Sequence, residues 1–330
     1  MSAQPRGVAH TPMETRHDII LRTAQLADEL GYEAFALPEG WGLDATLLLT
    51  EVALRTRRIR VVSGILSVWG RTPATLAMTA ATLHRISSGR YVLGLGPSTK
   101  ALVEGFHDVR FAHPADKLRE VTTKVRALLA GERALLDATP QARPLRLGQP
   151  AVPDLPIWLA AMGDHTVRVA AELADGWFPL LVTRDHLADR VPLLGKQRQA
   201  AGLRSQPLTV VAGPMTVAGD DPAVARRTSA NCLAWYLSAM GDVYARSVAE
   251  QGYGAAVQAI LEANPRPRPD SGVIPAEAQA LLDQFAAHGT PSQVKEQLVA
   301  WDAAVDLTMI GLPPGLPWPA IEATLRAAAP

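Results

Sequence analysis

Short apolar runs alternate along the chain with longer segments in which apolar residues recur at helical spacing. The first pair shows the pattern: Gly7–His10 predicts a strand, and Asp18–Leu30 predicts a helix that ends at Gly31. The predicted strands are Gly7–His10, Ala34–Pro38, Arg58–Leu66, Arg90–Gly96, Pro156–Ala161, Asp175–Val182, Leu208–Ala218 and Asp306–Pro313. The helices expected with them are Asp18–Leu30, Leu43–Arg55, Pro73–Arg85, Pro114–Ala130, Asp164–Leu173, Arg184–Ala201, Ser292–Ala304 and Trp318–Ala328.

Eight strands, each followed by a helix, predict an α/β fold of the (β/α)8 TIM barrel type. A doubly wound sheet is the alternative. The barrel is favoured because eight strands are the number that closes a TIM barrel, and no change of composition divides the chain into two domains. We therefore expect residues 1–330 to form a single barrel domain. The long segment Pro222–His288 reads as mostly helical, so residues 219–288 are expected to be an insertion between strands seven and eight, over or beside the barrel mouth. The Pro- and Gly-interrupted stretch Asp137–Leu155 is expected to be an exposed excursion.

Charge and cysteine content narrow the class of protein. The chain has 32 Lys and Arg against 32 Asp and Glu, so a formal net charge of zero gives no electrostatic case for nucleic acid or an anionic membrane surface. Cys232 is the single cysteine, which excludes an intrachain disulfide and fits a reducing cytoplasm. The first residues lack the apolar stretch of a signal peptide, and no run is long enough to span a membrane. The eight histidines show no metal-ligand spacing, so no metal is predicted.

The ends of the predicted strands carry small residues. In a barrel, the loops after the strands form the active face, so these positions are the candidates for chemistry. Strand three ends in Ser63-Gly64-Ile65, where a glycine indicates either a packing position or a place where a flat group approaches the backbone. Strand four ends in GLGPST, and Gly96, Pro97, Ser98 and Thr99 offer amides and hydroxyls to an anion. A tight turn explains the same residues, because the spacing does not match a dinucleotide fingerprint.

The end of strand five provides a second candidate phosphate site. Its residues are Ala161, Met162, Gly163, Asp164, His165 and Thr166, and a helix starts within them. Helix amides and a partial positive charge attract anions there. Asp164 is equally explained as a helix N-cap, but a cap does not account for the small residues before it. Two such loops on neighbouring strands are more informative than either alone.

The remaining candidates also lie at strand ends. The loop PEGWGLD after strand two places Glu39 and Trp41 on the active face, and Thr11 follows strand one. Glu39 can bind a ring N–H or move a proton, and Trp41 is either a pocket wall or a packing aromatic.

Together these residues resemble the luciferase-like flavin monooxygenase superfamily, in the branch that uses the deazaflavin coenzyme F420. The resemblance covers nearly the whole chain. Its most specific pieces are GILSVWGRTPATLAMTAATLHRISSGRYVLGLGPS, ALVEGFHDVRF, PADKLRE, PIWLAAMGDHTVRVAAELADGWFPLLV and GTPSQV. It implies a barrel of the bacterial-luciferase type, with a non-prolyl cis peptide at Ser63-Gly64 or Gly64-Ile65 behind the cofactor ring. It also implies a phosphate tail near Gly96–Thr99 and Ala161–Thr166.

The resemblance implies hydride chemistry, and two departures indicate its direction. Alcohol- and sugar-oxidising members carry a histidine where this chain has Gly40, and a glutamate where it has Pro97–Lys100. Their absence favours hydride delivery from the reduced deazaflavin to an activated C=C, C=N or C=O bond. Glu39 is then the candidate catalytic acid. The substrate pocket is expected to be lined by Trp41, Trp69 and Trp177.

Two other functions stay open at this point. One is an FMN-dependent monooxygenase that takes reduced flavin and O2, since both cofactors share the fold. The other is a barrel that binds a ligand without redox chemistry. The expected partners are a small-molecule substrate, a second copy of the chain in a homodimer, and a separate cofactor-reducing enzyme.

Overall fold

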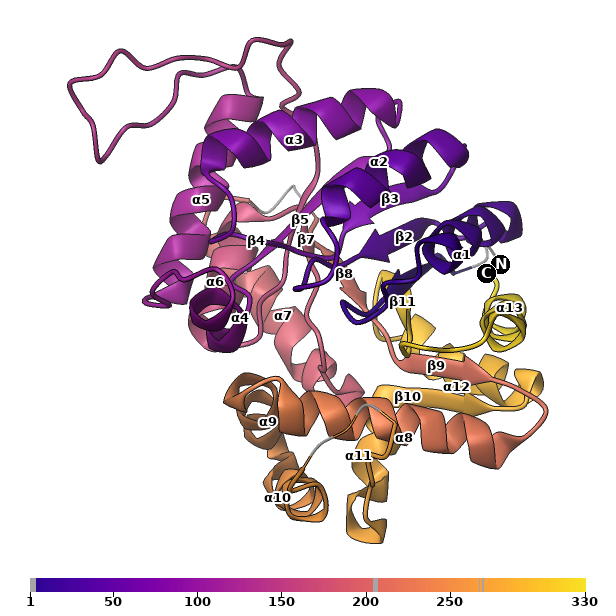
Figure 1. The fold of residues 1–330 in the computed structure, drawn as a ribbon. Helices are drawn as coiled ribbons and strands as arrows, with labels where there is room; N and C mark the ends of the chain where they lie inside the picture. Colours follow the sequence, from indigo (N-terminus) through magenta and orange to yellow (C-terminus); the bar gives the residue numbers. More distant parts are fainter. Residues whose placement is uncertain (1–3, 204–206, 267, 269) are drawn as a thin grey trace.

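Strands and helices alternate along the chain in the computed structural model, which describes residues 4–203, 207–266, 268 and 270–330. Within these residues, eight parallel strands close into a barrel with helices packed around it (Figure 1). The barrel strands are β1 (Arg6–His10), β2 (Ala34–Leu37), β3 (Arg60–Ser63), β5 (Tyr91–Gly96), β6 (Ile157–Leu159), β7 (Gly176–Trp177), β8 (Thr209–Ala212) and β11 (Leu307–Leu312). The ring closes because β11 pairs in parallel with both β8 and β1. The predicted (β/α)8 fold is confirmed.

The outer helices follow the predicted order, except that the short helix at Lys100–Gly105 was not predicted. They are α1 (His17–Leu30), α2 (Ala45–Arg55), α3 (Pro73–Ile86), α4 (Lys100–Gly105), α5 (Pro114–Leu129), α6 (Asp164–Leu173), α7 (Arg184–Ala200), α12 (Pro291–Asp302) and α13 (Trp318–Ala327). Gly31 ends α1 in the left-handed conformation, with φ of 85°. Thr290 begins α12 with a capping box in which its side chain and that of Gln293 exchange hydrogen bonds with the backbone. None of the described helices combines the length and apolarity needed to cross a membrane.

Alternation along the strands divides the barrel into an inner and an outer core. In β2, Ala34 and Ala36 belong to a cluster with residues from β3, β5, β6, β8 and β11, which therefore fills the ring. Phe35 and Leu37 of the same strand belong to the larger cluster between the strands and the helices. In β2 the small side chains therefore face the inside of the ring and the large ones face the helices.

A second group of helices follows β8. It consists of α8 (Pro222–Ala239), α9 (Asp242–Val248), η1 (Ala249–Tyr253), α10 (Gly254–Ala263), η2 (Ala276–Ala278) and α11 (Gln279–Phe285). We call the described residues of this segment, 222–285, the cap. The cap has a hydrophobic cluster of its own, and Figure 1 shows it as a separate group of orange helices beside the barrel. That residues 1–330 behave as one domain stays a prediction.

Four predicted boundaries are wrong. The predicted strand Arg58–Leu66 is two strands, β3 and β4 (Leu66–Ser67), with Gly64 and Ile65 between them. The predicted strand Leu208–Ala218 is two strands, β8 and β9 (Met215–Ala218), because Pro214 between them lacks an N–H for a ladder. The predicted helical run to His288 ends earlier, because Ala286–Gly289 forms β10 in parallel with β9. The predicted strand Asp175–Val182 pairs only at Gly176–Trp177. The excursion at residues 137–155 is confirmed as an exposed loop that extends away from the barrel (Figure 1).

The carboxyl ends of β3 and β5 approach each other unusually closely. A Cβ on Gly94 would lie 1.8 Å from the carbonyl oxygen of Ser63. The Ser63 hydroxyl accepts a hydrogen bond from the Gly94 N–H at 2.8 Å and donates to the Gly94 carbonyl at 3.1 Å. The Tyr91 hydroxyl donates to the same Ser63 oxygen at 3.0 Å. Only glycine fits at position 94 because the opposing atom is backbone.

Gly94→Ala is therefore expected to destabilise the fold by about 3 kcal/mol or more, since the new methyl group has to displace backbone. Thermal and denaturant unfolding measure the change. Gly195→Ala is the matched control: a Cβ at this position inside α7 meets nothing within 4 Å. That variant should gain about 0.5–1 kcal/mol from helix propensity. Equal stability of the two variants would contradict the proposed contact.

Candidate active site

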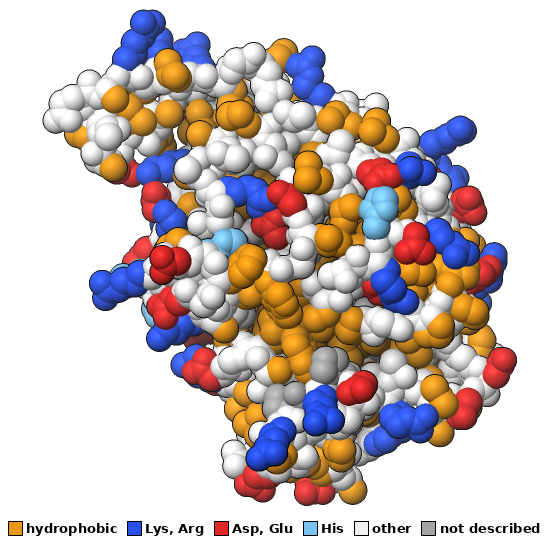
Figure 2. All heavy atoms as spheres, in the orientation of Figure 1, with side chains coloured by type: hydrophobic (Ala, Val, Ile, Leu, Met, Phe, Trp, Pro, Cys, Tyr) orange, Lys and Arg blue, Asp and Glu red, His pale blue; other side chains and the backbone are white. Residues whose placement is uncertain are grey.

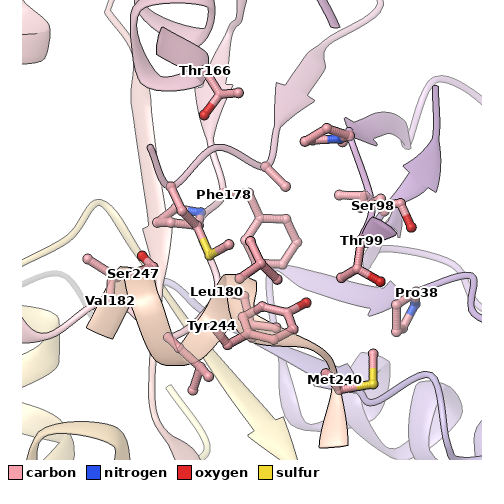
Figure 3. Close-up of a pocket in the computed structure, with 18 of the residues that line it drawn as sticks. Pro38, Ser98, Thr99, Thr166, Phe178, Leu180, Val182, Met240, Tyr244 and Ser247 are labelled. Atoms are coloured by element: carbon pink, nitrogen blue, oxygen red, sulfur yellow. The ribbon is translucent and has the colours of Figure 1, made fainter. Parts of the chain in front are cut away.

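A cavity of about 850 Å³ opens at the carboxyl ends of the barrel strands. Its floor comes from strand ends, including Ala9, Gly64, Ala160 and Gly311. Its walls come from the loops after β5, β6 and β7, and its roof comes from the cap. Figure 3 shows these parts facing one another, with Ser98 and Thr99 on one side and Tyr244 and Val182 on the other. The predicted active face and the cavity coincide.

The floor contains the expected cis peptide. The Gly64–Ile65 bond is cis, and both residues line the cavity. A Cβ on Gly64 would lie 3.0 Å from the Ala36 side chain and 3.4 Å from Phe178, and a Cβ on Gly96 would lie 3.0 Å from Ile65. Glycine is required at both positions because neighbouring side chains pack closely against them.

Ser63 does not reach the cavity, although the sequence placed it with the cofactor-binding residues. It is fully buried, and its hydroxyl is occupied by Gly94 and Tyr91. Its observed role is to fix the two strands behind the floor.

The two predicted phosphate loops meet at the cavity. Gly96, Pro97, Ser98 and Thr99 line it from β5, and Met162, Gly163, Asp164, His165 and Thr166 line it from β6. Ala161 is the exception: it is buried, and its carbonyl accepts a hydrogen bond from the Trp177 indole at 2.8 Å. The pairing of the loops is the observation on which the site depends.

The start of α6 is open toward the cavity. Gly163 is the N-cap and provides no side chain to satisfy the first amides, and a Cβ built on it meets nothing within 4 Å. Thr166 lies in the first turn and donates to the Gly163 carbonyl at 2.8 Å. The Asp164 carboxylate pairs with Arg190 at 2.5 Å, which offsets its charge at this end of the helix. Free amides, a hydroxyl and a helix dipole suit a phosphate group.

Glu39 lines the cavity but is held by an ion pair. Arg71 contacts both of its carboxylate oxygens, with Nη2 donating to Oε1 at 2.7 Å. Arg71 also reaches Asp44 at 3.0 Å. Burial acts to raise the pKa of Asp44, but hydrogen bonds from Thr46 and Arg71 outweigh it, so that pKa lies below its usual value. Arginine N–H groups occupy both carboxylate oxygens, and this arrangement suits a hydrogen-bond acceptor better than the predicted acid.

None of the three predicted pocket tryptophans is among the residues that line the cavity. Trp177 is buried in the core. Trp69 donates its indole N–H to the Pro97 carbonyl at 3.0 Å and so supports the β5 loop from behind. Trp41 is 43% exposed and packs against Trp235 of the cap, with ring centroids 6.5 Å apart. Trp69 and Trp177 thus stabilise the loops from behind, and Phe178, which follows Trp177, lines the cavity in their place.

His10 and Thr11 bring polar atoms to the floor at the end of β1. Both are buried, and their side-chain polar atoms have no hydrogen-bond partner among the described residues. Burial lowers the pKa of His10 to about 4, with Glu14 acting against this shift and Arg16 adding to it. The imidazole is therefore neutral near pH 7. The sequence predicted Thr11 and missed His10, although its place as the last residue of a strand is a usable signal.

The cap supplies lining residues that the sequence did not assign to the site. They are Tyr236, Met240, Val243, Tyr244, Arg246, Ser247, Glu250 and Phe285. A helical insertion without periodic motifs does not indicate which of its faces turns toward the barrel. Among the described residues, no group of His, Cys, Asp or Glu is arranged to hold a metal ion.

Comparisons with known proteins agree with this geometry. A family model described as luciferase-like monooxygenase matches residues 2–307. A Mycobacterium tuberculosis protein, provisionally named a coenzyme F420-dependent oxidoreductase, is 32% identical over 84% of this chain and 86% of its own.

Two solved structures share the fold. The coenzyme F420-dependent tetrahydromethanopterin reductase of Methanopyrus kandleri has a TM-score of 0.78 at 21% identity, covering 99% of this chain and 98% of its own. The oxygenating constituent of 3,6-diketocamphane monooxygenase from Pseudomonas putida, in complex with FMN, has a TM-score of 0.74 at 17% identity, covering 99% and 97%.

The buried His10 predicts a pH dependence of stability. Its folded pKa of about 4 lies below the ordinary value of 6.5, so its contribution is complete above pH 6.5 and is lost as the pH falls toward 4. The loss over that window is roughly 3 kcal/mol. Denaturant unfolding at successive pH values should show it in the wild type and not in His10→Phe. His165→Phe, which removes an exposed rim histidine, should keep the wild-type dependence; a flat wild-type curve would refute the assignment.

Proposed function

Because the chain belongs to the luciferase-like monooxygenase family, we propose that it is an oxidoreductase that uses coenzyme F420 to reduce a small organic acceptor. The chain is an enzyme, as its relatives are, which disfavours a barrel that only binds a ligand. The observation that carries the proposal is the meeting of two small-residue loops at a cavity whose floor is the bare Gly64–Ile65 segment.

The residues of the site fit a deazaflavin. The floor, to which Gly64, Ile65 and Gly96 contribute and in which the Gly64–Ile65 bond is cis, suits a flat tricyclic ring. The open start of α6 and the hydroxyls of Ser98 and Thr166 suit a phosphate. The unpartnered Thr11 hydroxyl is a further polar atom that a bound molecule can satisfy. The 32% identical relative named for F420 supports this cofactor over FMN.

The chemistry of the floor favours reduction over alcohol oxidation. Oxidation of an alcohol needs a base beside the hydroxyl, and the family's histidine is replaced here by Gly40. Glu39 is engaged by Arg71, and His10 is a weak base because burial lowers its pKa to about 4. Reduction needs only a proton for the product, which water at the cavity rim supplies.

The proposed roles follow from these positions. A hydride from C5 of the reduced deazaflavin is the chemistry that the bound cofactor supplies. Gly64 and Ile65 would lie behind the ring, the two loops would hold the phosphate, and Glu39 would accept a hydrogen bond from a ring N–H. The acceptor takes the hydride at carbon and a proton from water at the other atom of its double bond, so that its reduction balances the oxidation of the cofactor. The cap covers the acceptor from above, and the proton comes from water at the cavity rim.

Binding measurements test the cofactor. Titration with F420 and with FMN, each followed by its own fluorescence, should give a dissociation constant for F420 that is about tenfold lower or better. Tighter binding of FMN would overturn the assignment of F420. That result would favour the second candidate, an FMN-dependent monooxygenase, which the FMN-bound structural neighbour keeps open. Rapid oxygen consumption with reduced FMN and an acceptor would establish the second candidate.

Thr166→Val tests the phosphate site. Loss of the hydroxyl should weaken cofactor binding about fivefold, the value of one hydrogen bond of about 1 kcal/mol. Thr228→Val is the matched control, because the Thr228 hydroxyl bonds a helix carbonyl at 2.9 Å in α8 and does not line the cavity. Equal affinity for both variants would place the phosphate elsewhere.

The expected homodimer, the separate cofactor-reducing enzyme and the cytoplasmic location stay predictions. A dimer is testable by light scattering of the purified protein.

A further inference from the structure

The cap turns an apolar wall toward the cavity. Tyr236, Met240 and Phe285 are buried members of the cap's own hydrophobic cluster, and the same residues line the cavity. Leu181 and Met215 extend this cluster and the lining from the barrel side. Because these side chains are already packed against the cap interior, the wall is preformed and does not depend on a ligand to assemble it.

The polar groups on this wall are uncharged. Burial raises the pKa of Tyr244 to about 12, so its hydroxyl is neutral at physiological pH. In Figure 3 the Tyr244 ring projects into the cavity with its hydroxyl toward Thr99, and Leu180 and Met240 lie nearby. The wall therefore offers hydrocarbon, sulfur and a neutral hydroxyl.

Charged lining residues lie elsewhere. Those that are exposed are Asp116, Asp164, Arg246 and Glu250. Arg246, the cation among them, pairs with Asp242 at 3.0 Å. The half-buried Glu39 is neutralised by Arg71. Figure 2 shows the same division, with hydrophobic side chains gathered in the hollow and charged ones around it. Among the described residues that line the deep part of the cavity, none is a lysine or arginine that could receive an anionic substrate.

We propose that the cap wall binds a neutral, apolar carbonyl compound, a ketone or an enone on a hydrocarbon chain or ring, and disfavours carboxylated or phosphorylated acceptors. The proposal rests on the proposed function, because it names the acceptor for that hydride. The wall, with Met240 and Leu180 at its surface, is the specificity determinant. Binding an anionic acceptor would place its charge beside hydrocarbon. This is unfavourable because water solvates a charged group far better than hydrocarbon does.

Saturated ketones are suitable probes because they bind without consuming protein thiols. Calorimetric titration with 2-butanone, 2-hexanone and 2-octanone, with and without oxidised F420, should show affinity rising about threefold to fourfold for each added CH2. Levulinate, a ketone that carries a carboxylate, should bind more weakly than 2-hexanone. A flat chain-length series, or tighter binding of levulinate, overturns the proposal.

Two variants locate the effect. Met240→Gln keeps the size of the side chain and makes it polar, so it should weaken 2-octanone about fivefold and leave 2-butanone nearly unchanged. Leu180→Gln, at a partly buried position, is a second variant in case the first fails to fold. Met78→Gln is the matched control, because Met78 is 55% exposed on α3, away from the cavity. Equal losses for Met240→Gln and Met78→Gln would remove the wall from the explanation.

The two proposals fail in different ways. Loss of F420 binding with an intact chain-length series would refute the cofactor and keep the apolar wall. Normal F420 binding with a flat series would refute the wall and keep the cofactor. Competition between F420 and 2-octanone for one site would show that the wall holds the cofactor ring and would overturn the assignment of the acceptor.

Discussion

The close approach of Ser63 to Gly94 is the constraint on which the site depends. A side chain at position 94 would collide with the Ser63 carbonyl, so β3 and β5 can meet only through glycine backbone. The Ser63 hydroxyl then satisfies both backbone groups of Gly94, and Tyr91 completes the buried network. These bonds are buried and fully partnered, which makes them costly to break. The chain immediately after Ser63 forms the cavity floor, so its position follows from this contact.

Two further positions at the cavity floor are restricted to glycine. Gly64 and Gly96 lie where added atoms would crowd Ala36, Ile65 or Ala160. Larger residues stand behind the loops: Trp69 holds the Pro97 carbonyl, and Trp177 holds the carbonyl of Ala161. Buried aromatic residues thus support the two loops from behind, so the residues at the loop surface can be small. The geometry of such a site is fixed by the residues that support it and does not depend on the side chains at its surface.

The barrel was predictable from the sequence because strands and helices have different hydrophobic periods, and eight strand–helix pairs are the number that a TIM barrel contains. The cis bond and the two loops were found through the resemblance and through small residues at strand ends. Ser63 and Ala161 were misplaced because neighbours on a strand alternate between the cavity and its support. Trp41, Trp69 and Trp177 were assigned to the substrate pocket because large aromatic side chains often line pockets. In the structure they pack against the core, the loops or the cap instead. Strand β10 was missed because its partner β9 lies about seventy residues away, and that pairing is set by tertiary structure.

The cap and the barrel contribute different kinds of chemistry, and this separation bears on specificity. Barrel residues at the floor make contacts that backbone geometry dictates, so few substitutions are compatible with them. Cap residues such as Met240 and Tyr244 belong to a separate hydrophobic cluster, and their replacement by side chains of similar volume leaves the strands undisturbed. The acceptor side of the cavity can therefore change while the floor is kept. Under the proposed function, one cofactor surface could then serve many hydride acceptors, because the residues that contact the acceptor do not hold the barrel together.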